Sequence, residues 1–191
     1  MWAGIPLAAV WLFSFAAAFH AIVEATGNGD DEVTTWPDAN VLGWLAPALY
    51  VLAAAIISIA PGGLITGATL AASIENPAMA IFGLAAPPVL SGMVLFPFVY
   101  SSMLVEDNIM AIASPYTLRS LKIASDAWVF FYMYSILLVL LATAAVGMLI
   151  VENFVATAIG AVAFVAVAFV YARLLGRLMW VAAQRDAKHA G

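Results

Sequence analysis

Side chains that could hold a hard metal ion gather in one short polar segment, residues 24–40. Within residues 28–38 of this segment, five carboxylate or amide side chains lie close to two glycines: Asn28, Asp30, Asp31, Glu32 and Asp38. Carboxylate and amide oxygens bind Ca²⁺ and Mg²⁺, so Asp30, Asp31 and Glu32 are candidate metal ligands. Their spacing does not match the twelve-residue calcium loop, which ends on a carboxylate and has glycine at its sixth position. We prefer to interpret the segment as a solvated connector in which Asp38 caps the next helix, with a metal site as the alternative.

Groups for covalent or acid–base catalysis are sparse. The chain has no cysteine, which excludes disulfides, thiol catalysis and thiolate-bound metals. Its two histidines, His20 and His189, have no convincing partner for a nucleophile–base pair. Only six residues are basic and the net charge is −5, which argues against nucleic acid as a partner, because phosphates are bound by clustered Lys and Arg. We therefore expect no enzyme and no cofactor.

The charged residues favour a structural role instead. We expect ion pairs between the polar segment and the bases, and these pairs would close the ends of the helices that carry them. The candidates on the acidic side are Glu24, Asp30, Glu32 and Asp38, and on the basic side Arg119, Lys122, Arg173 and Arg177.

Composition places most of the 191 residues in lipid. Hydrophobic residues make up 66% of the chain and charged residues 9%, whereas a soluble domain carries roughly a quarter charged residues. A helix needs about 20 apolar residues to cross the hydrocarbon layer, and every backbone group there must bond within the helix. These rules predict a single all-α polytopic bundle of about five spans, at 2–23, 41–60, 79–105, 127–151 and 154–175. Between and after them lie the acidic loop 24–40, an interfacial connector 106–126 and a basic tail 176–191.

Proline and glycine interrupt the second and third spans. Pro61-Gly62-Gly63 is expected to kink or end a helix, which would leave residues 64–73 as an interfacial or re-entrant piece. Pro87-Pro88 and Pro97 punctuate the third span in the same way. A sixth crossing is therefore the alternative to five.

Three short patterns predict local structure. Ser114-Pro115 is typical of a helix start, with serine as the cap and proline in the first turn. Gly63-x-x-x-Gly67 and Ala156-x-x-x-Gly160 are spacings that let two helix backbones approach closely.

The basic residues also predict an orientation. Those near 119–122 and those after the fifth span are separated by two crossings, so both groups can lie on the cytoplasmic side, as the positive-inside rule prefers. The N-terminus is then outside and the C-terminus cytoplasmic. Of the 17 charged residues, only Glu75 and Glu152 would face the exterior.

Two stretches resemble a family signature. Residues 21–38 carry Ile22-Val23-Glu24-x-Thr26, then Gly29-x-Asp31-Glu32-Val33, then Trp36-Pro37-Asp38, and residues 171–178 read YARLLGRL. These stretches resemble a family of bacterial multi-pass membrane proteins of the planctomycete type, whose activity is uncharacterised. The resemblance implies an inner-membrane protein and brings no activity with it. Members of that family extend further upstream, so it also implies a truncated N-terminus; a missing crossing there would move the true N-terminus inside.

On these grounds we expect a non-enzymatic membrane component, a scaffold or accessory subunit with a structured cytoplasmic face. Its partners would be the lipid bilayer and other membrane proteins. The alternative is a small-solute or lipid transporter, or a subunit of one. A transporter should enclose a polar path near residues 61–67 and 87–97, where proline and glycine free backbone carbonyls.

Overall fold

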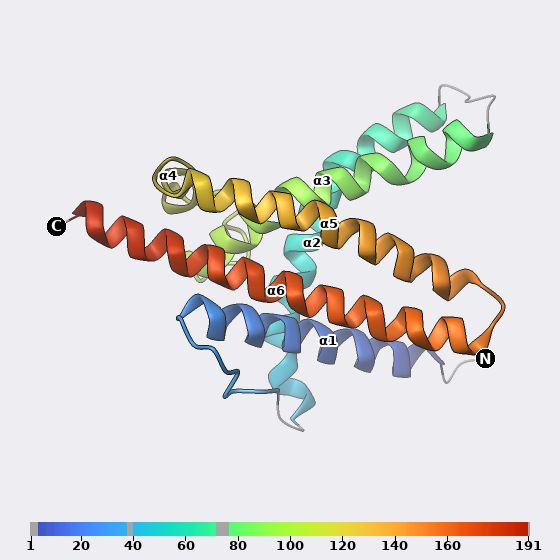
Figure 1. The fold of residues 1–191 in the computed structure, drawn as a ribbon, viewed down its shortest axis with the longest axis horizontal. Helices are drawn as coiled ribbons and strands as arrows, with labels where there is room; N and C mark the ends of the chain where they lie inside the picture. The colour runs from blue at the N-terminus through green and yellow to red at the C-terminus, as the bar shows by residue number, and fades with distance from the viewer. Residues whose placement is uncertain (1–3, 38–39, 72–76, 191) are drawn as a thin grey trace. The chain divides into compact units, whose positions relative to one another are not determined.

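The computed structural model describes residues 4–37, 40–71 and 77–190, and its regular structure there is helical throughout (Figure 1). The elements in chain order are α1 (Gly4–Gly27), η1 (Val41–Trp44), α2 (Leu45–Ala71), α3 (Pro77–Val105), α4 (Pro115–Ile123), α5 (Ser125–Ile150) and α6 (Phe154–Ala190). Within the described ranges, five helices are long and apolar enough to cross a membrane. The predicted all-α polytopic bundle with five spans is therefore confirmed.

The chain divides into two compact units, Met1–Ala48 with Arg119–Gly191, and Leu49–Leu118. The first unit consists mainly of α1, α5 and α6, which run side by side, with α6 in contact with both α1 and α5 (Figure 1). The second unit is formed by most of α2, by α3, and by the connector that leads into α4.

Small residues bring α6 against its two neighbours in the first unit. A Cβ added at Gly176 would lie 2.7 Å from the backbone oxygen of Val23 on α1. A Cβ at Gly160 would lie 2.7 Å from the backbone oxygen of Ala145 on α5. Lipid tails are as apolar as leucine, so helices associate through such close packing rather than by exclusion of water. The expectation from Ala156-x-x-x-Gly160 is thus met at Gly160.

The buried face of α5 repeats at steps of three, four, three and seven residues. It consists of Trp128, Phe131, Ser135, Leu138 and Ala145. This period of about 3.5 residues is that of a coiled-coil seam. The residues between them are apolar as well, including Phe130 and Met133 at 59% and 61% exposure, which is the pattern of a helix with lipid on its other side.

In the second unit α2 and α3 also touch backbone to backbone. A Cβ added at Gly62 would lie 2.2 Å from the backbone oxygen of Pro87. By contrast, no atom of the described residues lies within 4 Å of a Cβ added at Gly63 or Gly67. The close approach expected from Gly63-x-x-x-Gly67 is therefore made by the neighbouring glycine instead.

The break expected after residue 60 is absent. Residues 64–71 do not form a separate interfacial piece, because α2 continues through Pro61 to Ala71; residues 72 and 73 lie outside the described ranges. The ribbon of α2 changes direction within the helix (Figure 1). In α3, Pro87, Pro88 and Pro97 all lie inside one helix. A helix in lipid tolerates proline where neighbouring hydroxyls satisfy the freed carbonyls, whereas ending the helix would leave several backbone groups without partners.

The basic segment 176–191, set apart above as a tail, is part of the last helix as far as the structure describes it. α6 has 37 residues, which corresponds to about 55 Å at 1.5 Å per residue. Its apolar part runs from Phe154 to Ala172, about 28 Å, and this matches the hydrocarbon thickness of about 30 Å. The part that begins at Arg173 therefore projects beyond the hydrocarbon as helix.

The connector between α3 and α5 contains the predicted short helix. α4 begins at Pro115, and Ser114 Oγ accepts a hydrogen bond from the backbone N–H of Tyr116 at 3.1 Å. The backbone oxygen of Ser114 accepts from the N–H of Leu118 at 3.0 Å. The serine cap and the proline in the first turn are confirmed.

Candidate functional site

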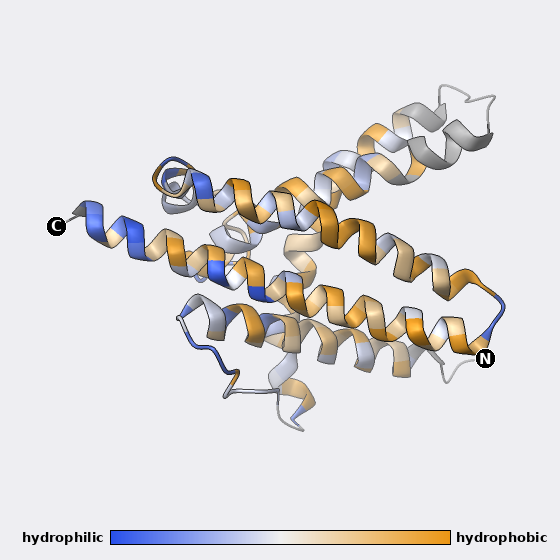
Figure 2. Ribbon diagram, viewed as in Figure 1, coloured by the Kyte–Doolittle hydropathy of each residue, from blue (hydrophilic) through white to orange (hydrophobic). Residues whose placement is uncertain are grey.

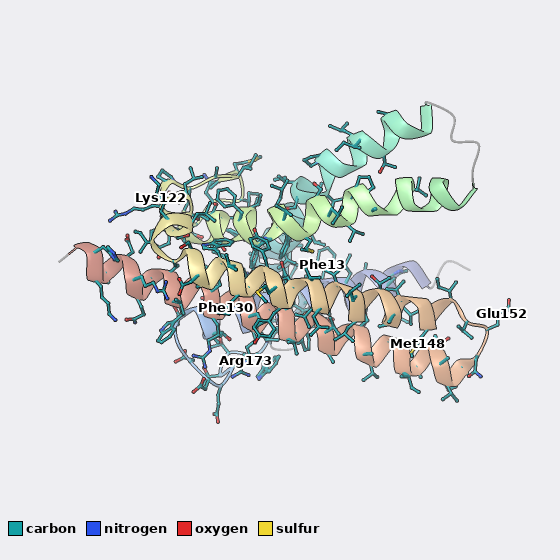
Figure 3. All side chains as sticks on the ribbon, turned by 45° about the horizontal axis from the view of Figure 1, so that its top comes forward. Phe13, Lys122, Phe130, Met148, Glu152 and Arg173 are labelled. Carbon is teal, nitrogen blue, oxygen red and sulfur yellow. The ribbon has the colours of Figure 1, made fainter. Side chains whose placement is uncertain are left out.

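Charged residues of the first unit collect at one end of its helices. We call the polar end the set Asp31, Arg119, Asp126, Arg177, Arg185 and Asp186, which are joined in ion pairs. Hydrophilic colouring marks the loop after α1 and several places along the C-terminal half of α6, while the half of α6 that follows the turn after α5 is apolar (Figure 2). Glu152 lies at the turn between α5 and α6, and Lys122 lies toward the opposite end of the unit (Figure 3).

A bidentate pair joins the start of α5 to α6. Arg185 Nη2 donates to Asp126 Oδ2 at 2.7 Å, and Nη1 donates to Oδ1 of the same carboxylate. Two parallel bonds fix the relative direction of the guanidinium and the carboxylate. Asp126 also stands in the first turn of α5, where the positive end of the helix dipole favours a negative charge.

The next residue of α6 makes the second link. Asp186 Oδ1 lies 3.3 Å from Arg119 Nε, which belongs to α4. Arg185 and Asp186 thus reach α5 and α4, respectively, from adjacent positions on one helix.

A third link ties the loop after α1 to α6. Arg177 donates to the Asp31 carboxylate, and Arg173, one turn earlier, donates to the backbone oxygen of Asp31. The Arg177 guanidinium also lies 5.8 Å from the centre of the Trp180 ring, a distance at which cation–π attraction operates.

Glycine allows the loop to lie this close to α6. Gly29 has φ +92°, and a Cβ there would lie 2.6 Å from Trp180 Nε1. A left-handed backbone and the lack of space both require glycine at this position. The loop therefore packs against Trp180 at Gly29, two residues before Asp31 pairs with Arg177.

The expected pairing between the polar segment and the bases is present at one position. Asp31 is the acidic partner, while Asp30 and Glu32 are exposed. Glu24 lies 3.9 Å from His20 Nε2, one turn away on α1. Arg119 pairs with α6 instead of the loop, and no ion pair of Lys122 is found among the described residues. Asp38 lies outside the described residues, so its role as a cap stays a prediction.

Three members of the polar end were not among the predicted site residues: Asp126, Arg185 and Asp186. The sequence could have indicated Asp126, because an acidic residue is common in the first turn of a helix. The pairing itself depended on α6 continuing as helix past residue 175, which places Arg185 and Asp186 on a rigid element.

The metal alternative finds no geometric support in the described part of the chain. No three His, Asp or Glu side chains there lie close enough together to hold one ion. The carboxylate of Asp31, the middle member of the candidate set, accepts from Arg177, and its backbone oxygen accepts from Arg173.

Hydroxyl groups on α2 and α3 bond backbone carbonyls in the second unit. Thr66 Oγ1 donates to the backbone oxygen of Leu84 at 3.2 Å. Pro88, four residues after Leu84, has no N–H with which to bond that oxygen. Ser91 Oγ donates to the backbone oxygen of Ser58 at 2.6 Å. The backbone oxygens of Leu84 and Ser58, which lie just before residues 87–97 and 61–67, therefore each accept from a hydroxyl of the other helix.

An apolar groove runs along the first unit between α1, α5 and α6. Its volume is about 670 Å³, and its lining includes Trp11, Leu149 and Val162. A second groove of about 190 Å³ is lined by Phe19, Leu138 and Tyr171 among others, and Phe164 belongs to both. The two grooves therefore adjoin at Phe164, inside the apolar part of α6.

No protein-family model, curated protein or solved structure matches the chain.

Proposed function

We propose that this chain is a non-enzymatic component of a bacterial inner membrane, a scaffold or accessory subunit. The observation that supports this is the polar end, where one helix links the loop after α1, α4 and α5. Exposed ion pairs contribute little to the free energy of folding. Their consequence is geometric, because they hold charged side chains in one arrangement that a partner protein can recognise.

We further propose that the polar end is cytoplasmic. All six Lys and Arg residues of the chain belong to this part of the first unit: Arg119, Lys122, Arg173, Arg177, Arg185 and Lys188. Glu152 is the charged residue at the opposite turn. Basic residues are retained on the cytoplasmic side during insertion, so this distribution favours a cytoplasmic C-terminus and an N-terminus outside.

Co-purification tests the scaffold role. The tagged chain is isolated from bacterial membranes in mild detergent, and the ratio of co-purifying proteins is measured by quantitative mass spectrometry. We expect a membrane protein at constant ratio with the native chain, and a lower ratio with Asp30→Lys combined with Glu32→Lys. Both side chains are exposed at the loop, so the double variant changes the charge without breaking the three links.

Glu152→Lys is the control, since it reverses the charge of one acidic residue at the opposite end and should leave the ratio unaltered. The scaffold role would be rejected by the absence of any constant partner, or by a partner whose ratio is equal in all three proteins.

Lipid handling is the second candidate function, and the groove at Phe164 favours it. The groove opens on an apolar part of the helices and is lined by aromatic and aliphatic side chains, which suits an acyl chain better than a polar solute. Ala161→Trp would fill the groove, and we expect it to reduce the lipid that remains bound after delipidation, measured by mass spectrometry. Ala183→Trp, exposed on the same helix outside the groove, is the control. Equal lipid in the two variants would remove this candidate.

A further inference from the structure

The connector between α3 and α5 exposes large apolar side chains although it lies outside the long apolar helices. Met110 is 76% exposed and Leu118 53%. The complete set of exposed large apolar residues between positions 106 and 123 is Ile109, Met110, Ile112, Leu118 and Leu121. Single exposed hydrophobic residues are common on soluble surfaces, so the number alone does not settle what they face.

The short helix α4 exposes leucine and basic side chains together. Its buried side chains include Thr117 and Ser120, at 2% and 6% exposure, while Leu118 and Leu121 are exposed with the two basic residues of the helix. A helix beside water buries its apolar side chains. A helix at a membrane surface instead turns apolar and basic side chains toward the lipid.

The connector holds this arrangement through specific hydrogen bonds. Ser114 Oγ donates to Glu106 Oε1 at 2.8 Å, and the N–H of Ser114 donates to Ser102 Oγ at 3.1 Å. Asp107, whose φ is +45°, accepts from the Tyr50 hydroxyl at 2.9 Å. The acidic side chains of the connector, Glu106 and Asp107, thus accept hydrogen bonds from residues of their own unit. Its large apolar side chains remain exposed.

On its α3 side, the exposed strip begins directly after a membrane helix of its own unit. Val105 is 43% exposed at the end of α3. The exposed residues Ile109, Met110 and Ile112 follow within seven positions. The strip therefore prolongs the exposed apolar surface of α3.

We propose that this connector is an interfacial anchor: residues 109–121 lie along the membrane surface, with their apolar side chains inserted at the boundary between headgroups and acyl chains. The basic residues of α4 fit this placement. Lys122 is exposed and has no ion pair among the described residues, and Arg119 lies beside the two leucines. Lysine can extend from this depth to a lipid phosphate. The connector would anchor in this way whichever partner the polar end binds.

Spin labelling of single cysteines tests the anchor directly, because the chain has no native cysteine. Met110→Cys and Leu118→Cys are labelled with a nitroxide and reconstituted in vesicles of phosphatidylethanolamine and phosphatidylglycerol. Collision rates with oxygen, which concentrates in lipid, and with a nickel chelate, which stays in water, are then measured. Asp30→Cys in the loop provides the water reference, and Leu140→Cys, 63% exposed on α5, the lipid reference.

We expect both connector labels to fall between the references, about 5–10 Å below the phosphate level. Collision rates equal to those of Asp30→Cys would overturn the anchor, because the strip would then face water. Low collision rates with both reagents would also overturn it, since they would show that protein covers the strip. An unchanged elution volume and helical signal, relative to the cysteine-free parent, establish that the labelled chains are folded.

Discussion

At the scale of single residues, glycine decides where α6 can touch its neighbours. Gly176 faces the backbone oxygen of Val23 and the Cβ of Thr26, each at 2.7 Å from an added Cβ. Neither atom is the flexible end of a long side chain, so even one methyl group must push the helices apart. Gly147 on α5 provides the contrast, because in the described part of the chain nothing lies within 4 Å of a Cβ added there.

We predict that Gly176→Ala lowers the free energy of unfolding relative to Gly147→Ala. Both substitutions gain up to about 1 kcal/mol of helix propensity, but overpacking at Gly176 costs about 1–3 kcal/mol. Thermal unfolding of the two variants in detergent measures the difference. If the two midpoints shift equally, α1 and α6 are not in close contact at this position.

Two threonine hydroxyls differ in what they contribute to stability, because they bond different carbonyls. Thr66 bonds the Leu84 oxygen on the other helix, which Pro88 leaves without its usual donor. Thr143 Oγ1 bonds the Val139 oxygen of its own helix at 2.8 Å, where a backbone N–H is also present.

Thr66→Val is therefore expected to destabilise the second unit by about 0.6–1.7 kcal/mol, the range for hydrogen bonds between membrane helices. Thr143→Val should change stability less, and Thr66→Ser should restore most of the loss because it keeps the hydroxyl. Unfolding titrations with a denaturing detergent compare the three variants. A loss that serine does not restore would assign the effect to packing of the methyl group.

At the scale of elements, α6 is the part that links the others in the first unit. Its pairs with Asp126, Arg119 and Asp31 come from residues spread over about three turns of its charged half. Since the helix is rigid, a change at one pair alters the position of an entire neighbouring segment rather than one side chain.

Exchange of the two charges at the α5 pair tests this linkage. Asp126→Arg places like charges opposite each other, so we expect a lower unfolding temperature than in the native chain. Combining it with Arg185→Asp should recover most of the loss, because the exchanged pair can form again. The effect should shrink in high salt, which screens exposed charges. A double variant no more stable than Asp126→Arg alone would show that the pair is not formed.

At the scale of the whole molecule, the two ends of the first unit differ in charge. The loop after α1 and the end of α6 are joined at one end, and Glu152 lies at the other. This difference makes the proposed orientation testable with a reagent that does not cross membranes.

Asp30→Cys and Lys188→Cys are expected to react with an impermeant maleimide only after the cytoplasmic face is exposed, for example in inverted vesicles. Glu152→Cys should react in intact cells with a permeable outer layer. The opposite pattern would reverse the proposed orientation while leaving the fold intact. Labelling of Asp30→Cys and Lys188→Cys from different sides would contradict the link between Asp31 and Arg177.

Composition alone determined that this chain lies in lipid, and helices follow from that, because no other open structure satisfies the backbone without water. Local patterns were equally sufficient at Ser114-Pro115, where the cap depends only on residues close in sequence. Hydrophobic periodicity, however, cannot show which face of a membrane helix packs, since all faces are apolar. The seam of α5 from Trp128 to Ala145 was therefore hidden among residues of the same kind.

Only the tertiary structure decided which of several similar residues make the contacts. Gly62 rather than Gly63 meets α3, and Asp31 rather than Asp30 or Glu32 meets Arg177. It also decided that α2 passes through Pro61, because the cost of a proline depends on neighbours from another helix. The sequence determines whether lipid or water surrounds each segment, because that depends on the composition of the segment. Which residues pair with one another depends on distances between segments far apart in the chain, and only the tertiary structure gives these.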